Sequence, residues 1–125
     1  MIASRGHKGA DPTAAGELQS FKAQFFRALA HPTRIRILEI LRRGERTVQE
    51  LQEALGLPQP IVSQHLAVLR TQGILTTQKA GPAVRYALRD RLVGDLLDVA
   101  RQIFSNRLVD TRGLLRELRR EGRRA

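Results

Sequence analysis

The stretch TVQELQEALGLPQPIVSQHLAVLRTQGIL, residues 47–75, decides the fold of this chain. Apolar residues recur at the three- and four-residue spacing of a helix in residues 48–55 and again in residues 59–72, and Gly-Leu-Pro at 56–58 predicts a tight turn between two helices. On the second helix, small hydrogen-bonding residues lie opposite an apolar seam formed by Val62, Leu66 and Leu69. Such a helix can rest on its own domain and offer its other side to the edges of DNA bases, so the stretch predicts a helix-turn-helix.

Two further helices are predicted before this stretch. Residues 17–29 repeat apolar side chains at helical spacing, namely Leu18, Phe21, Phe25 and Leu29. The second predicted helix runs from Pro32, which suits a first helical position, to Gly44, which is typical of a helix end. Thr47 and Glu50 have the spacing of a capping box, so the first helix of the helix-turn-helix is expected to begin there.

The pattern changes from helical to strand-like after the helix-turn-helix. Residues 74–77 and 84–88 read as two strands joined by a turn at 79–82, a hairpin that we call the wing. A fifth helix with many apolar residues is predicted from Asp90, followed by a more polar sixth helix. The expected fold is mostly α-helical with a small β-hairpin: a flexible arm over residues 1–16, a winged helix-turn-helix domain over residues 17–104, and a basic helix or tail over residues 105–125.

The charge of the chain points to a polyanionic partner. Its 125 residues are enough for one domain, and 22 Lys and Arg against 12 Asp and Glu give a net charge of +10. This excess attracts nucleic acid first and an anionic membrane surface second. Cysteine is absent, which excludes disulfides and thiolate metal ligands. The sequence has neither an apolar run of about 20 residues nor a secretory signal, so we expect a cytoplasmic protein without a membrane partner.

Three segments, in this order, resemble the ArsR/SmtB-type winged-helix repressors of prokaryotes: FFRALAHPTRIRILEIL (25–41), LGLPQPIVSQHLAVLRTQGIL (55–75) and KAGPAVRYAL (79–88). The resemblance implies a dimer whose first and fifth helices form the interface. It also implies a fourth helix that enters the major groove and a wing that lies along the DNA backbone. The broad apolar faces of the first and fifth helices fit this arrangement, so we expect a homodimer interface that includes Phe21, Phe25, Leu96 and Ile103.

The fourth helix and the wing supply the predicted DNA contacts. When the apolar seam faces inward, Gln59, Ser63 and Gln64 are left for reading base edges, and a glutamine can both donate to and accept from adenine. The candidates for contacts to the DNA backbone are Arg70, Lys79, Arg85 and His65. Packing inside the domain is the alternative for His65, because it lies beside the seam. Weaker backbone candidates near the start of the second helix are Arg34 and Arg36.

Two prolines depart from the family's pattern. Pro58 stands where similar proteins carry a serine that caps the fourth helix, so that cap must come from elsewhere or be missing. Pro82 follows the wing glycine, where the family often has an arginine. This difference argues against insertion of the wing tip into the minor groove.

The sensor sites of the resembling proteins are not reproduced. Their cysteine site corresponds to residues 46–49, which contain no cysteine, and their site on the fifth helices corresponds to Asp90, Leu92, Ile103 and Asn106, of which one can be a ligand. The remaining weak metal candidates are His7, His31, Asp90, Asp95 and Asp98. Oxygen and nitrogen ligands would suit nickel or zinc, and ordinary surface and capping roles are the alternative.

These observations predict a homodimeric DNA-binding transcriptional regulator, more specifically a repressor on an inverted-repeat operator, and they identify no certain cofactor. Alternatives with the same fold are regulators that respond to a divalent metal (nickel or zinc) or to a co-regulatory protein. An alternative of another class is a basic module that binds a partner protein or an anionic surface without sequence preference. An enzyme is not expected, because the sequence has no cysteine, nucleophile elbow, phosphate-binding glycine loop or paired-carboxylate site.

Overall fold

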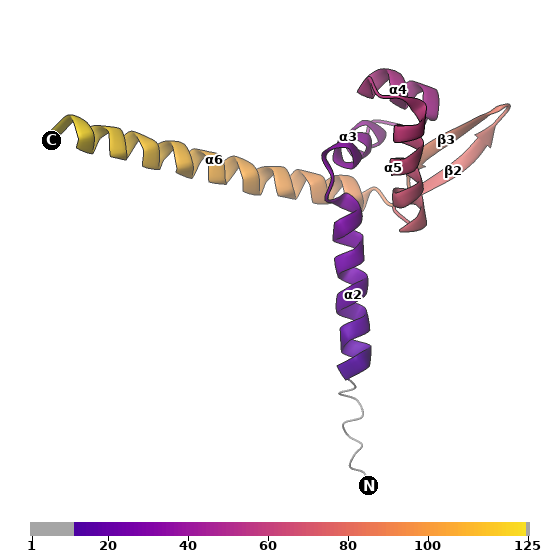
Figure 1. The fold of residues 1–125 in the computed structure, drawn as a ribbon, viewed down its shortest axis with the longest axis horizontal. Helices are drawn as coiled ribbons and strands as arrows, with labels where there is room; N and C mark the ends of the chain where they lie inside the picture. Colours follow the sequence, from indigo (N-terminus) through magenta and orange to yellow (C-terminus); the bar gives the residue numbers. More distant parts are fainter. Residues whose placement is uncertain (1–11, 125) are drawn as a thin grey trace, which may run out of the picture. The chain divides into compact units, whose positions relative to one another are not determined.

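The computed structural model of the protein describes residues 12–124, and Figure 1 shows their fold. The elements follow one another as α2 (Pro12–Leu29), α3 (Pro32–Leu41), β1 (Arg46–Thr47), α4 (Val48–Leu55), α5 (Gln59–Thr71), β2 (Leu75–Ala80), β3 (Ala83–Leu88) and α6 (Leu92–Arg124). The chain divides into one compact unit up to Asp90 and a second unit from Arg91, and each is described by itself. Within residues 12–124, no helix combines the length and the apolar character that crossing a membrane requires.

The core of the first unit joins α3, α4 and α5. Its fully buried side chains are aliphatic and come from all three helices and from the start of β2: Ile37, Leu38, Leu51, Val62, Leu66, Leu69 and Leu75. Each such side chain contributes about 1.5–3 kcal/mol relative to full exposure. The predicted apolar seam of α5 is therefore confirmed, and this seam fixes the helix to its domain.

The predicted starts of two helices are confirmed by their caps. Pro32 opens α3, and the Nδ1 atom of His31 accepts a hydrogen bond of 3.1 Å from the backbone N–H of Thr33. The capping box of α4 is complete: the N–H of Glu50 donates to the Thr47 hydroxyl (3.2 Å), and the N–H of Thr47 donates to the Glu50 carboxylate (2.9 Å). These caps fix where the helix-turn-helix begins.

The wing is a three-stranded antiparallel sheet in the order β1-β3-β2 rather than an isolated hairpin. Strands β2 and β3 pair from Leu75 opposite Leu88 to Ala80 opposite Ala83, and the turn between them contains Gly81 at φ 65°. The two-residue strand β1, which the sequence analysis missed, pairs Thr47 with Arg85. The wing is thus joined directly to the start of α4.

Several helix boundaries differ from the prediction: α3 ends at Leu41 and not at Gly44, and α6 begins at Leu92 and not at Asp90. The first helix begins at Pro12 and not at Glu17, and residues 1–11 of the predicted arm lie outside the described residues. The predicted fifth and sixth helices are one continuous helix, α6, of 33 residues. The polar residues Ser105 and Asn106 cost only fractions of a kcal/mol in a helix interior, so they do not interrupt it.

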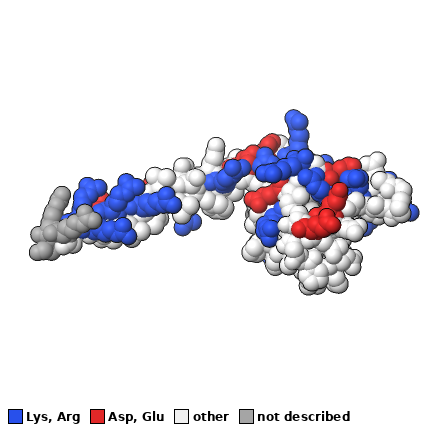
Figure 2. Space-filling model, turned by 90° about the horizontal axis from the view of Figure 1, so that it is seen from above, with Lys and Arg blue, Asp and Glu red and all other residues white. Residues whose placement is uncertain are grey.

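The two halves of α6 differ in charge. Residues 105–124 contain seven arginines against three acidic residues. In Figure 2, Lys and Arg predominate among the charged side chains of the part of α6 near the C-terminus. The basic character predicted for residues 105–125 thus belongs to a helix as far as the structure describes them.

Candidate nucleic-acid interface

Helix α5 has one buried and one open side. The side chains of Val62, Leu66 and Leu69 are at most 1% exposed, whereas Gln59 and Gln64 are exposed and Ser63 is half-buried. Gln59 donates a hydrogen bond of 2.8 Å from Nε2 to the Ser63 hydroxyl. The three predicted base-reading residues therefore belong to the open part of α5, and the structure joins two of them by a hydrogen bond.

The N-terminus of α5 has no side-chain cap. Its N-cap residue is Pro58, whose backbone is extended (φ −65°, ψ 150°), and the N–H groups of Ile61 and Val62 turn back to the Pro58 carbonyl. Of the two possibilities left open by the sequence, the missing cap is the one found. An uncapped helix N-terminus keeps its partial positive charge available to an anion such as a DNA phosphate.

A groove of about 550 Å³ lies where the starts of α4 and α5 face the wing. None of the described residues that line it is charged; they are Thr47, Val48, Gln49, Gln59, Ser63, Pro82, Ala83, Val84 and Tyr86. Hydroxyl and amide groups in such a groove can donate to and accept from a nucleic acid without a strong electrostatic preference. Gln49 on α4 and Tyr86 on β3 were not predicted from the sequence as groove residues, and the position of Tyr86 depends on the sheet register.

The strand register places the two basic wing residues on opposite faces of the sheet. Lys79 is opposite Val84, and Gln78 is opposite Arg85. Because side chains of a strand alternate between faces, Lys79 shares a face with Val84 and Tyr86, which line the groove, and Arg85 lies on the other face.

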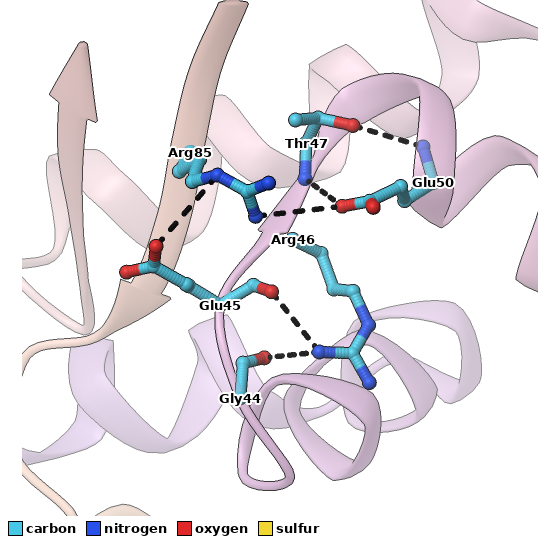
Figure 3. Close-up of polar contacts among 6 residues, drawn as sticks. All are labelled: Gly44, Glu45, Arg46, Thr47, Glu50 and Arg85. Atoms are coloured by element: carbon cyan, nitrogen blue, oxygen red, sulfur yellow. Dashed lines mark hydrogen bonds and ion pairs between the residues drawn. The ribbon is translucent and has the colours of Figure 1, made fainter. Parts of the chain in front are cut away.

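Arg85 contacts two carboxylates instead of the groove (Figure 3). Its Nε lies 3.7 Å from Glu45 and its Nη1 lies 3.8 Å from Glu50, the capping residue of α4. The hydrogen bond from the Thr47 backbone N–H, and secondarily the positive charge of Arg85, lower the pKa of Glu50. Arg46 is also engaged, since its Nη1 donates to the carbonyls of Gly44 and Glu45. The predicted role of Arg85 at the DNA backbone gains no support from this geometry.

His65 is less exposed than the glutamines of α5 and lies beside a second histidine. It is half-buried, and its ring centroid is 4.3 Å from that of His31, with a tilt of 47° between the rings. Burial, followed by the charges of His31 and Arg34, lowers the pKa of His65. Packing, the alternative that the sequence left open, therefore describes His65 better than a contact to the DNA backbone.

The other residue of α5 that was predicted to contact the DNA backbone is distant from the start of the helix. Arg70 is exposed in the last turn of the helix, 11 residues beyond Gln59. At 1.5 Å per residue this spacing corresponds to about 16 Å along the helix axis. The structure therefore assigns Arg70 and Gln59 to different ends of α5.

The residues predicted for a dimer interface are apolar and largely accessible. Phe21 on α2 is 68% exposed and Ile103 on α6 is 53% exposed, whereas Phe25 and Leu96 are half-buried. Phe25 and Phe26 contact each other edge to face at 5.4 Å. Further exposed apolar side chains on these two helices include Leu18, Phe26, Val99, Phe104, Leu108, Leu115 and Leu118. Extensive apolar surface of this kind is typical of an interaction site.

The weak metal candidates do not come together in the described part of the chain. Residues 12–124 contain no group of three or more His, Asp or Glu residues placed to hold a metal ion. His31 caps α3, and Asp98 forms an ion pair of 2.9 Å with Arg101. His7 lies outside the described residues.

Comparison with known proteins agrees with this architecture. The family model "Bacterial regulatory protein, arsR family" matches residues 31–77. The HTH-type transcriptional regulator Rv0081 of Mycobacterium tuberculosis is 41% identical over 106 residues, which cover 84% of this chain and 93% of the relative. A probable mercury resistance operon repressor of Streptomyces lividans is 46% identical over 79 residues, 63% of each chain.

Solved structures give the same result. The crystal structure of Rv0081 from M. tuberculosis matches with a TM-score of 0.70 and 41% identity, covering 74% of this chain and 94% of that one. The homodimeric winged helix-turn-helix domain of Mb0332 from Mycobacterium bovis matches with a TM-score of 0.67 and 26% identity, covering 72% and 83%. The chain belongs to the ArsR family of winged helix-turn-helix transcriptional regulators, which bind DNA and are not enzymes.

Proposed function

We propose that this regulator is a repressor that binds an inverted-repeat operator as a homodimer, with Gln59, Ser63 and Gln64 reading base edges. The observation that carries the proposal is the division of α5 into a buried seam and an open side next to an uncapped N-terminus. A helix held in this way can enter the major groove with its N-terminal residues against the bases. Gln64 is exposed, so its amide is available for a bidentate contact to adenine.

The phosphate contacts proposed for the wing are limited to one of its faces. Lys79 is exposed and lies on the face that lines the groove, so it is the wing residue proposed to contact the DNA backbone. Arg70 is proposed to reach a phosphate farther along the duplex from the last turn of α5. We leave Arg85 and His65 out of this set, since the first faces two carboxylates and the second packs against His31.

The homodimer is proposed to form through α2 and α6, with Phe21, Phe25, Leu96 and Ile103 in the shared core. Their exposure supports this role, and the related Mb0332 domain is described as homodimeric. Two copies of α5 would then meet half-sites about one helical turn of DNA apart. Such a repressor would act in the cytoplasm. A regulator that responds to a divalent metal or to a co-regulatory protein is the alternative; within residues 12–124 no group of three or more His, Asp or Glu residues is placed to hold a metal ion.

The test is selection of genomic DNA fragments by the purified protein, which we expect to yield one inverted repeat. The Gln64→Ala variant should lose about 1–3 kcal/mol of discrimination at one base position per half-site. Gln102→Ala, the same change at an exposed position of α6, is the matched control and should keep full discrimination. Unchanged base preference in Gln64→Ala would exclude this side of α5 as the reading surface, and a stable monomer in sedimentation at micromolar concentration would exclude the dimer.

A further inference from the structure

A polar pocket lies between α2, α3 and α5, away from the groove at the start of α5. Its volume is about 470 Å³. The described residues that line it come from α2, from the turn after it, from α3 and from the end of α5: Gln24, Arg27, Ala28, Ala30, Arg34, Val68 and Gln72. Two arginines and two glutamines therefore line one pocket, and none of the described lining residues is acidic.

Arg34 supplies the second observation. Its Nε is buried and has no hydrogen-bond partner, and it is the sole side-chain atom in this state among the described residues. Its guanidinium takes part in none of the salt bridges found among these residues. A buried donor without an acceptor costs folding free energy, and native proteins rarely leave one unless an unseen group satisfies it. The missing group should be an acceptor, and next to two guanidinium groups it should be negatively charged.

The surroundings of Arg34 extend this electropositive region to the reading helix. His31 and Arg34 both disfavour the charged form of His65, which is on α5 and half-buried. An anion beside Arg34 would offset that positive field. Occupancy of the pocket would therefore change the environment of α5 near its C-terminal end, one to two turns beyond Gln64.

We propose that this pocket binds a small oxyanion, a carboxylate or a phosphate, held by Arg27 and Arg34, and that the oxyanion is an effector of DNA binding. The planar fork of a guanidinium matches the two oxygens of a carboxylate or phosphate, and Gln24 and Gln72 add amide donors. A ligand in this position would connect α2 with the end of α5. The effect on DNA binding rests on the proposed function, whereas binding of the anion does not.

A phosphate of the operator itself is a second possible source of this oxyanion. Val68 and Gln72 follow Gln59 by 9 and 13 residues, which corresponds to about 14–20 Å along a helix. Gln64 is closer, about 6–12 Å from the same two residues along the helix. A freely diffusing anion is the ligand that we propose. The experiment has one arm for each source.

The first arm uses the full chain without DNA. Inorganic phosphate and citrate are titrated at constant ionic strength, with chloride as the compensating anion, while the melting temperature and the NMR signals of the arginine Nε–H groups are recorded. Wild type and Arg36→Gln should respond alike, because Arg36 is exposed on the same helix and lines a different pocket. Arg34→Gln and Arg27→Gln should bind at least tenfold more weakly. Equal responses in all four proteins, or no response in wild type, would overturn the proposal.

The second arm measures operator affinity with and without the anion that binds. Allosteric couplings commonly change affinity by 5–150-fold, so we expect at least a fivefold change in wild type and none in Arg34→Gln. If Arg34→Gln instead flattens the salt dependence of DNA binding and no free anion binds, the oxyanion is a DNA phosphate and the effector role is wrong. If no operator is found at all, the proposed function fails while the anion-binding result stands.

Discussion

The two ends of α5 have opposite surroundings. Around Gln59 the helix is uncapped and borders a groove lined only by uncharged residues among those described. Around Val68 and Gln72 it borders α2 and α3, and arginines line the pocket there. The same buried seam serves both ends. One helix can therefore present a neutral, hydrogen-bonding end to one partner and a cationic end to another, provided that its middle is fixed to the core.

The largest effect is expected from breaking the seam that both ends share. Leu66 is 1% exposed in the core that α5 forms with α3 and α4, so Leu66→Ala should lower the free energy of unfolding by about 2–5 kcal/mol. Ile61→Ala, on the same helix but 41% exposed, should cost clearly less. Urea unfolding followed by circular dichroism measures both. A decrease below about 1 kcal/mol for Leu66→Ala would mean that the seam does not fix α5.

A smaller effect is expected at the uncapped end. Pro58 has the extended backbone of an N-cap residue, so serine at this position can accept a hydrogen bond from the first turn of α5. Pro58→Ala removes the same proline rigidity without supplying a cap. We therefore expect Pro58→Ser to be more stable than Pro58→Ala by about 1 kcal/mol in thermal unfolding. Equal melting temperatures for the two variants would show that the first turn gains nothing from a cap.

The two faces of the wing near that end should differ in how they affect the salt dependence of DNA binding. Lys79→Gln should reduce the slope of log affinity against log salt by about one, because a lysine that neutralises a phosphate releases counterions from the DNA. Arg85→Gln should leave the slope unchanged and cost about 0.2–1 kcal/mol of stability, as for other exposed ion pairs. Fluorescence titration of operator DNA at several salt concentrations measures both slopes. A reduced slope in Arg85→Gln would return Arg85 to the residues that bind the DNA backbone.

The smallest effect concerns pH and the histidine pair. The folded-state pKa of His65 lies below its ordinary value of 6.5, so the folded protein favours the neutral ring. Below pH 6.5 the unfolded chain then binds more protons than the folded one at this site, and stability decreases as the pH falls through the folded pKa. His65→Gln should make the free energy of unfolding less dependent on pH below 6.5, the ordinary pKa of this side chain. An unchanged profile would show that His65 does not contribute.

The sequence predicted those features that depend on neighbouring residues. The seam of α5, the capping box of Thr47 and Glu50, and the missing cap at Pro58 all follow from residues within a few positions of one another. The strand β1 was not predicted, because a strand of two residues is too short to show a periodic pattern. The partners of Arg85 lie 35 and 40 residues away, and only the pairing of β1 with β3 brings them together.

The sequence also predicted a break within α6 that the structure does not have. The change from apolar to basic residues after Phe104 reads as a boundary in composition, yet a helix ends only where its backbone is interrupted. The pocket at Arg34 was equally inaccessible to sequence reasoning, because it needs the packing of three helices. From the sequence, Arg34 and Arg36 were predicted only as weak candidates for phosphate contacts.

The order of the two units along the gene has a consequence for truncated alleles. Every fully buried side chain that holds α5 precedes Leu92. The ribosome has therefore completed the first unit before it translates α6. A nonsense codon within α6 would leave these residues intact while deleting part of the surface proposed for pairing. Under the proposed dimer, such a shortened product would keep the α5 contacts to one half-site and lose the affinity that simultaneous binding to the second half-site adds.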